Sequence, residues 1–146
     1  MTEDNAFAVP PKCAIWTSRR QAVESPRVLV VDDYVDTADA IGMVLAIEDF
    51  PTRVVYGGHE AIEAARQWHP DIVMLDIWMP DVSGIEVAIR LRADPVTSNA
   101  ILVAHSAVSS TEDVNAVRLA HFDAYCSKPT DPSMLGPLLR YLCRGA

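Results

Sequence analysis

The segment Arg27-Val28-Leu29-Val30-Val31-Asp32-Asp33 is a short apolar run that ends in a pair of acids. Continuous apolar runs of this length are typical of strands that are buried on both faces. The pattern returns three times, each time with one polar side chain directly after a strand-like segment. These segments are 71–75 before Asp76, 100–105 before Ser106 and 124–127 before Lys128. Four such strands in one parallel sheet would bring three carboxylates, a hydroxyl and an ammonium group to one edge.

The intervals between these runs have helical spacing. In the first interval Ala38, Ile41 and Leu45 recur every three or four residues, and we expect them to face the core. Ser109 and Glu112 have the spacing of a capping box, which predicts that the fourth helix begins there. The expected strands are 27–31, 53–56, 71–75, 100–105 and 124–127. The first helix is expected at about 36–48, and the second follows Gly57-Gly58 and runs to about Trp68. The third is opened by Ser83-Gly84, the fourth starts at 109–112, and the last begins near Asp131.

Five strands that alternate with five helices predict an α/β fold with a doubly wound, five-stranded parallel sheet. In the flavodoxin-like strand order 2-1-3-4-5, ligands bind at the carboxyl ends of the first and third strands. Asp32-Asp33 and Asp76 occupy those two ends. We assign residues 26–146 to this domain and residues 1–25, which are more polar and contain Pro10-Pro11, to an N-terminal extension.

The side chains expected at the sheet edge predict a chemistry. Crowded carboxylates require a cation, and Mg²⁺, with Mn²⁺ as a substitute, is the hard ion that prefers oxygen ligands. A lysine and a hydroxyl beside a metal-bound carboxylate suit a phosphoryl group. The sequence therefore points to phosphoryl transfer onto an aspartate.

Composition excludes several other classes. The formal net charge of −8 argues against a nucleic-acid surface. No uncharged apolar run approaches the ~18 residues of a membrane span, and the N-terminus lacks the order of a signal peptide. The cysteines Cys13, Cys126 and Cys143 are odd in number and have no Cys-x-x-Cys spacing. We therefore expect neither a disulfide framework nor a zinc site, and a reduced, cytoplasmic compartment.

Five short motifs follow one another along the chain: Val30-Val31-Asp32-Asp33, Leu75-Asp76-Ile77-Trp78-Met79-Pro80, Ser83-Gly84, Ser106-Ala107 and Tyr125-Cys126-Ser127-Lys128-Pro129. Taken together, they resemble the receiver domain of two-component response regulators. The resemblance covers residues 27 to about 143.

The resemblance implies a role for each polar residue of the edge. Asp76 resembles the phosphate acceptor, and Asp33 resembles a direct Mg²⁺ ligand. Asp32 resembles a looser ligand that holds metal-bound water. The backbone carbonyl of Trp78 is implied as a further ligand. Lys128 is implied to pair with Asp76 before phosphorylation and with a phosphoryl oxygen afterwards.

Other residues are implied to shape and sense the phosphoryl group. Ser106 would hydrogen-bond it, and small Ala107 would leave it room. Tyr125 occupies the place of the family's switch aromatic. Pro129 follows Lys128 in a peptide bond that is typically cis in the family. Trp78 and Val108 flank the approach of hydrolytic water; neither side chain can orient a water, which predicts slow loss of the phosphoryl group.

Two positions depart from the family pattern or from helical geometry. His121 stands where the family usually has a glycine before the last strand, so we expect a reshaped end of the fourth helix. Pro137 falls inside the last helix if that helix begins near Asp131, which predicts a kink or a helix that restarts at Pro137.

The expected function is a stand-alone, non-enzymatic receiver. It would accept a phosphoryl group from a histidine kinase or phosphotransfer protein onto Asp76 and act on a downstream protein partner, without binding nucleic acid or membrane. One alternative is a relay receiver, excised from a hybrid kinase or passing phosphate to a histidine phosphotransfer protein. A remote alternative is a Mg²⁺-dependent phosphohydrolase, which would need an Asp-x-Asp motif after the first strand instead of Asp32-Asp33. Homodimerisation is left open.

Overall fold

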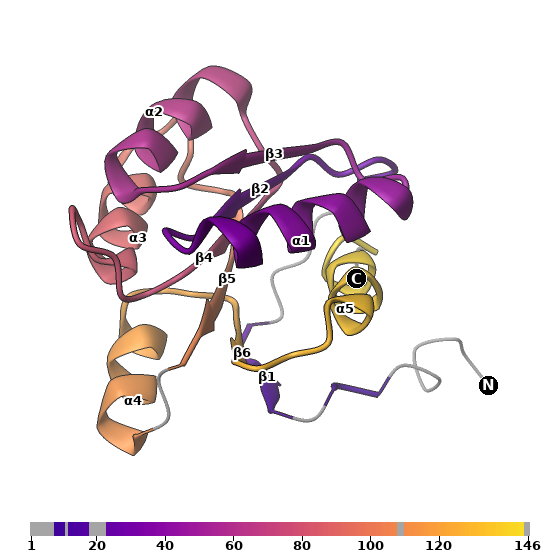
Figure 1. Ribbon diagram of the computed structural model, residues 1–146. Helices are drawn as coiled ribbons and strands as arrows, with labels where there is room; N and C mark the ends of the chain where they lie inside the picture. The colour runs from indigo at the N-terminus through magenta and orange to yellow at the C-terminus, as the bar shows by residue number, and fades with distance from the viewer. Residues whose placement is uncertain (1–7, 11, 18–22, 108–109, 145–146) are drawn as a thin grey trace.

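The computed structural model describes residues 8–10, 12–17, 23–107 and 110–144, which form one sheet with helices on both faces (Figure 1). The strands are β1 Cys13–Ile15, β2 Val28–Val31, β3 Thr52–Val55, β4 Ile72–Leu75, β5 Ile101–Ser106 and β6 Ala124–Ser127. The helices are α1 Val35–Ile47, α2 Gly58–Trp68, α3 Gly84–Ala93, α4 Thr111–Leu119 and α5 Leu135–Leu142, and the 3₁₀ turn η2 Pro132–Met134 precedes α5.

The sheet has the order β1-β6-β5-β4-β2-β3. The five strands from β2 to β6 are parallel to one another, which confirms the predicted flavodoxin-like order. The strand β1 is an addition that the sequence did not predict. It comes from the N-terminal extension and pairs antiparallel with β6 at the edge of the sheet.

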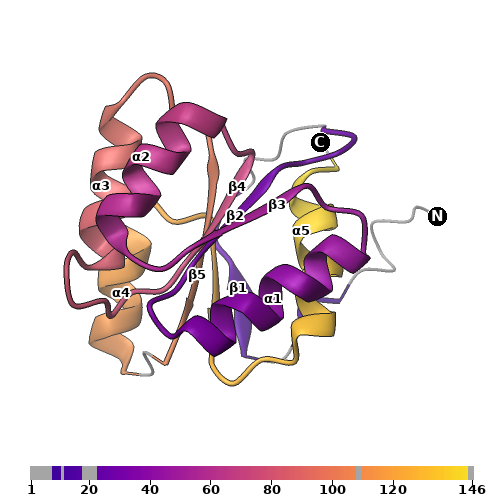
Figure 2. The ribbon, with the colours of Figure 1, turned by 45° about the horizontal axis from the view of Figure 1, so that its top comes forward.

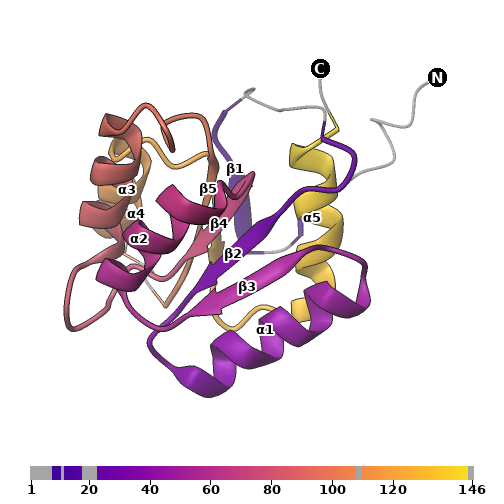
Figure 3. The same cartoon turned by 90° about the horizontal axis from the view of Figure 1, so that it is seen from above.

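The helices divide into two layers, which Figures 2 and 3 show from different sides. Helices α2, α3 and α4 cover one face, and α1 and α5 cover the other. Each strand supplies both cores because alternate side chains point to opposite faces. Leu29 and Leu75 pack under α2 and α3, whereas Val30 and Met74 pack against α1 and α5.

The predicted inward face of α1 is confirmed, because Ala38, Ile41 and Leu45 are all buried. The start of α4 differs from the prediction. Its N-cap is Ser110, whose hydroxyl accepts a hydrogen bond from the backbone N–H of Asp113. Ser109, the predicted cap, lies outside the described residues. Two adjacent serines, each followed three residues later by an acid, gave the sequence no means of choosing between them.

The end of α4 keeps its usual geometry without a glycine. His121 takes a positive φ of 67°, in the left-handed region that commonly ends a helix. The expected reshaping of this helix end was therefore wrong, since the histidine adopts the required conformation itself.

The C-terminal helix does not restart at Pro137 as predicted, but it changes from 3₁₀ to α-helical geometry near its start. The chain passes through the 3₁₀ turn before α5 begins at Leu135, two residues earlier than the predicted restart. Pro137 consequently lies in the first turn of α5, where its nitrogen has no hydrogen bond to lose. The α-helical part is eight residues long, and its leucines are buried against α1 and the sheet.

The structure pairs Cys13 with Cys126 in a disulfide, and Cys143 is free and buried. This one disulfide goes against the expectation, drawn from the number and spacing of the cysteines, that disulfides are poorly supported. The expectation failed because nothing in the sequence indicates that residues 13–15 lie beside 124–126.

Candidate functional site

Three carboxylates gather at the carboxyl ends of two neighbouring strands. Asp32 and Asp33 follow β2, and Asp76 follows β4. One oxygen from each lies within 4.8 Å of the others. Asp32 and Asp76 are buried, whereas Asp33 is exposed, so the cluster opens to solvent on the side of Asp33.

The only cation shown in contact with these carboxylates, among the residues described, is the ammonium group of Lys128. Its Nζ lies 2.7 Å from Asp32 Oδ2 and 3.7 Å from Asp76 Oδ2. The sequence had paired Lys128 with Asp76, and the structure brings it closer to Asp32. One positive charge thus faces two buried negative charges.

This imbalance appears in the titration of Asp76. The pKa of Asp76 is raised to about 6 because burial, the largest cause, and the charge of Asp32 both raise it, while Lys128 lowers it. A carboxyl group with a raised pKa is one whose charged form is poorly stabilised. A divalent cation at the cluster would supply the missing charge.

Backbone groups fix the orientation of the buried acids. The N–H of Ile77 donates to Asp76 Oδ1 at 2.8 Å, and the N–H of Tyr34 donates to Asp32 Oδ1 at 3.0 Å. These bonds leave the other oxygen of each carboxylate for Lys128 or a ligand.

Gly84 allows the loop after β4 to close tightly behind the acceptor. A Cβ on Gly84 would collide with the backbone carbonyl of Asp76 and lie 2.9 Å from the Cα of Ile77. The N–H of Gly84 donates to the carbonyl of Ile77 at 2.8 Å, and Ser83 caps α3 through Glu86 N–H. The Ser83-Gly84 motif is therefore a packing requirement of this loop.

The end of β5 adds a hydroxyl to the site. Ser106 Oγ is buried and lies close enough to Asp76 to lower the pKa of that carboxyl group, although it makes no hydrogen bond of ordinary geometry with the described residues. The carbonyl of Ser106 accepts from the backbone N–H of Lys128 at 2.8 Å, which holds the two residues side by side. The Lys128–Pro129 peptide bond is cis, as the resemblance implied. Ala107 is exposed, and Val108 lies outside the described residues.

The two aromatic residues singled out from the sequence differ in environment. Trp78 is 59% exposed, whereas Tyr125 is only 7% exposed. The ring of Tyr125 stacks on Trp16 of the N-terminal extension, with 5.9 Å between centroids and 3° between planes. The sequence placed Trp16 in the N-terminal extension and gave no reason to expect it on Tyr125.

Asp81, to which the sequence analysis gave no role, joins the loop after β4 to the start of α2. The carboxylate of Asp81 accepts from the N–H groups of Gly58 and His59 at 3.2 and 3.0 Å. These hydrogen bonds lower the pKa of Asp81 to about 2, and the bond from the His59 N–H has the largest effect. The acid preference of helix N-termini and the Gly57-Gly58 pair were the available signals.

The residues present suit a magnesium ion. Asp32, Asp33 and Asp76 supply only oxygen atoms, they lie close together, and their charge is incompletely balanced. These three side chains would hold the ion, and the predicted contribution of the Trp78 carbonyl is an expectation that the geometry leaves untested.

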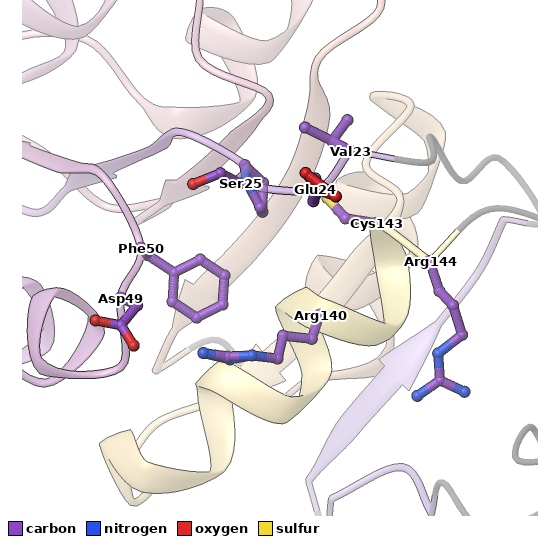
Figure 4. Close-up of a pocket in the computed structure, with 9 residues that line it drawn as sticks. Val23, Glu24, Ser25, Asp49, Phe50, Arg140, Cys143 and Arg144 are labelled. Atoms are coloured by element: carbon purple, nitrogen blue, oxygen red, sulfur yellow. The ribbon is translucent and has the colours of Figure 1, made fainter.

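A separate pocket lies at the other end of the sheet. It has a volume of about 390 Å³ and collects residues from the starts of β2 and β3 and the end of α5 (Figure 4). Arg140 packs over the ring of Phe50, 4.5 Å from its centroid, and the lining carries both charge signs. It contains none of the predicted site residues. The lining residues are Val23, Glu24, Ser25, Pro26, Asp49, Phe50, Arg140, Cys143 and Arg144.

Within the described part of the chain, the structure shows no helix that is both long and apolar enough to cross a membrane.

Comparisons with known proteins agree with this geometry. The family model described as the response regulator receiver domain matches residues 28–140. The DNA-binding response regulator MtrA of Mycolicibacterium paratuberculosis is 38% identical over 109 residues, which are 75% of this chain and 47% of that protein. The chain thus spans about half the length of these curated relatives. The polar-differentiation response regulator DivK of Brucella ovis is 29% identical over 79% of this chain and 94% of its own length.

Solved structures show the same fold. A response regulator receiver domain from Francisella has a TM-score of 0.73 and 28% identity, covering 81% of this chain and 96% of its own. The chemotaxis protein CheY4 of Vibrio cholerae has a TM-score of 0.76 at 20% identity, covering 81% and 98%.

Proposed function

Because this chain belongs to the family of response regulator receiver domains, we propose that Asp76 accepts a phosphoryl group from a histidine kinase or a histidine phosphotransfer protein. The phosphorylated chain then acts on a downstream protein partner. The observation that carries the proposal is the buried Asp76 carboxylate, which shares one lysine with Asp32 at the carboxyl edge of the sheet.

The transfer itself needs little from the chain beyond position and charge. An oxygen of Asp76 attacks the phosphorus, the bond from phosphorus to the donor's nitrogen breaks, and a mixed anhydride forms. Mg²⁺, when bound, neutralises charge on the phosphoryl oxygens. Lys128 then pairs with a phosphoryl oxygen, and the buried hydroxyl of Ser106 donates to another.

The event is stoichiometric, with one phosphoryl group per chain, so the chain is a regulator and not a turnover enzyme. We place it in the cytoplasm, where family membership puts its kinase and partner. The net charge of −8 favours a protein partner over nucleic acid. Direct signalling and onward transfer to a phosphotransfer protein both remain within this proposal, and the direction of transfer between purified components separates them.

We further propose that the phosphorylated state is long-lived. Hydrolysis requires a water aligned with the bond from Asp76 to phosphorus. The side chain of Trp78, two residues after Asp76, has an indole that can donate a hydrogen bond but cannot accept one from such a water. Its 59% exposure supports an alternative in which the indole is a contact for partners.

The test is labelling by acetyl phosphate in Mg²⁺. Asp76→Asn should abolish labelling because the nucleophile is lost. Asp49→Asn makes the same chemical change at the far end of the sheet and should label like wild type. Labelling of the Asp76 variant at the wild-type level would refute the assignment.

A further inference from the structure

The residues 12–16, which we call the strap, cover the edge of the sheet at β6 (Figure 1). Alternate side chains of the strap enter both cores. Cys13 and Ile15 pack with the core under α1 and α5, and Trp16 packs with the core under α2, α3 and α4, where it stacks on Tyr125. The strap thus covers the backbone of β6 and the ring of Tyr125 together.

A disulfide joins the strap to β6 at one register position. Cys13 lies directly opposite Cys126, with 4.1 Å between their Cα atoms. The backbone bonds lie on either side of this pair: Ser127 N–H donates to the carbonyl of Lys12 at 2.9 Å, and Trp16 N–H donates to that of Asp123 at 2.8 Å. Facing residues of this kind, between hydrogen-bonded positions, are the closest in an antiparallel pair. The sheet register therefore brings the two sulfurs together.

The two sulfurs differ in accessibility. Cys126 is fully buried, whereas Cys13 is only partly buried at the edge of the sheet. Cys13 is therefore the half of the disulfide that lies nearer to solvent. The other attachments of the strap are non-covalent: a three-residue strand, the packing of Ile15 and Trp16 on the two cores, and Arg118 over the Trp16 ring. The disulfide adds a covalent link to these contacts.

A buried imidazole lies next to Cys126 in the sheet. His105 on β5 is in register with Cys126, and alternation places both side chains on the same face. His105 is 5% exposed, and its Nε2 has no hydrogen-bond partner among the described residues. A thiol on Cys126 is a weak donor. Reduction would therefore create a donor where a buried nitrogen lacks a partner.

We propose that Cys13–Cys126 is a reversible redox site that fastens the strap over β6 and Tyr125 when oxidised and releases it when reduced by a dithiol. Disulfides in a reducing compartment are typically redox-sensing rather than structural, which fits the proposed cytoplasmic location. The strap ends its pairing at Ser127, the residue before Lys128, so its release acts directly beside the phosphoacceptor site. This last consequence rests on the proposed function.

The exchange balances in two steps. A thiolate of the reductant attacks Sγ of Cys13, the disulfide bond breaks, and Sγ of Cys126 leaves with the electron pair and takes up a proton. The second sulfur of the reductant then attacks the mixed disulfide and releases Cys13, which also takes up a proton. The dithiol is oxidised to a disulfide, and two electrons pass to the chain.

The test begins with a thiol count. Protein kept in air is denatured and alkylated with iodoacetamide, and its intact mass is measured by mass spectrometry. We expect one alkylated cysteine, Cys143, and three after treatment with dithiothreitol. Three alkylated cysteines before reduction, in protein kept in air, would overturn the proposal.

The release of the strap is measured by hydrogen exchange of the Ser127 amide, which donates to Lys12. We expect reduction to speed this exchange about tenfold or more in wild type, since the amide loses its partner. Cys143→Ser is the matched control and should respond like wild type. Cys13→Ser should exchange fast in both conditions. An unchanged Ser127 rate after the disulfide is broken would overturn the proposal, because the strap would be held without it.

Labelling by acetyl phosphate separates this inference from the proposed function. We expect the initial rate of labelling to differ about fivefold between oxidised and reduced wild type, which is within the usual range of coupling between sites. In Cys13→Ser, the reductant should leave this rate unchanged. No labelling in either state would refute the proposed function, while the thiol count and the Ser127 amide would still decide the redox site.

Discussion

Replacing Asp76 with asparagine should stabilise the metal-free protein at neutral and alkaline pH. Burial raises the pKa of Asp76 from 3.8 to about 6, so its ionised form is disfavoured in the folded state. An asparagine has nearly the same shape and remains neutral at every pH. The substitution therefore removes a buried charge for which Lys128, shared with Asp32, only partly compensates.

The magnitude follows from the pKa difference. One pKa unit corresponds to about 1.4 kcal/mol, so the rise to about 6 corresponds to roughly 3 kcal/mol. The cluster is open to solvent beside Asp33, which reduces this figure. We expect a gain in the free energy of unfolding of roughly 1–2 kcal/mol, or about 3–8 °C in Tm for a chain of this size.

The sign of the pH dependence is fixed by the direction of the shift. Between about pH 4 and pH 6 the folded wild type holds a proton that the unfolded chain has lost, so its stability falls as pH rises through this range. The advantage of Asp76→Asn should be complete above about pH 7 and should disappear near about pH 4.

The assay is urea unfolding in a metal chelator at several pH values, with Asp49→Asn as the matched control. Asp49 is exposed at the far end of the sheet, so its variant should show no such pH-dependent gain. A variant at Asp76 that is no more stable than wild type at about pH 8, or whose gain is the same at about pH 4, would refute the reasoning.

Three further predictions concern the same region. Millimolar Mg²⁺ should raise the Tm of wild type because it binds the folded state, and Asp33→Asn should reduce the shift; an equal shift in both proteins would remove Asp33 from the site. Trp78→Asn combined with Val108→Glu should speed the decay of purified phosphoprotein in Mg²⁺, and decay no faster than wild type would show that these side chains do not set the lifetime. Gly84→Ala should cost about 2 kcal/mol or more in urea unfolding, because its Cβ meets the rigid backbone of Asp76. Gly136→Ala should cost less, since the atoms that its Cβ meets belong to the flexible side chain of Glu48; the reverse order would contradict this argument.

The sequence predicted the parallel sheet because strand-like and helical segments alternate, and because four of the five strand-like segments end in a polar residue. The carboxyl ends of parallel strands meet at one edge, so Asp32, Asp33, Asp76, Ser106 and Lys128 could be brought together without a structure. Their partners were harder to predict. The position of Lys128 relative to Asp32 and Asp76 depends on side-chain rotamers that no spacing encodes.

The strand β1 and the Cys13–Cys126 disulfide could not have been predicted, for a different reason. Three residues are too few to show a period, and an antiparallel partner more than a hundred residues away leaves no local pattern. The role of Asp81 was missed because it depends on a contact between a loop and a helix from different parts of the chain.

The edge strand also bears on how the domain is best prepared. The family match begins at residue 28, so a boundary chosen by alignment would remove β1. The backbone donors and acceptors of β6 would then be open to strands of other molecules, and Cys126 would lose its partner. Such a shortened domain would be prone to association between sheet edges. Its oligomeric state would then result from the removal of β1 and would differ from that of the longer chain. Recombinant versions should therefore retain residues 12–16.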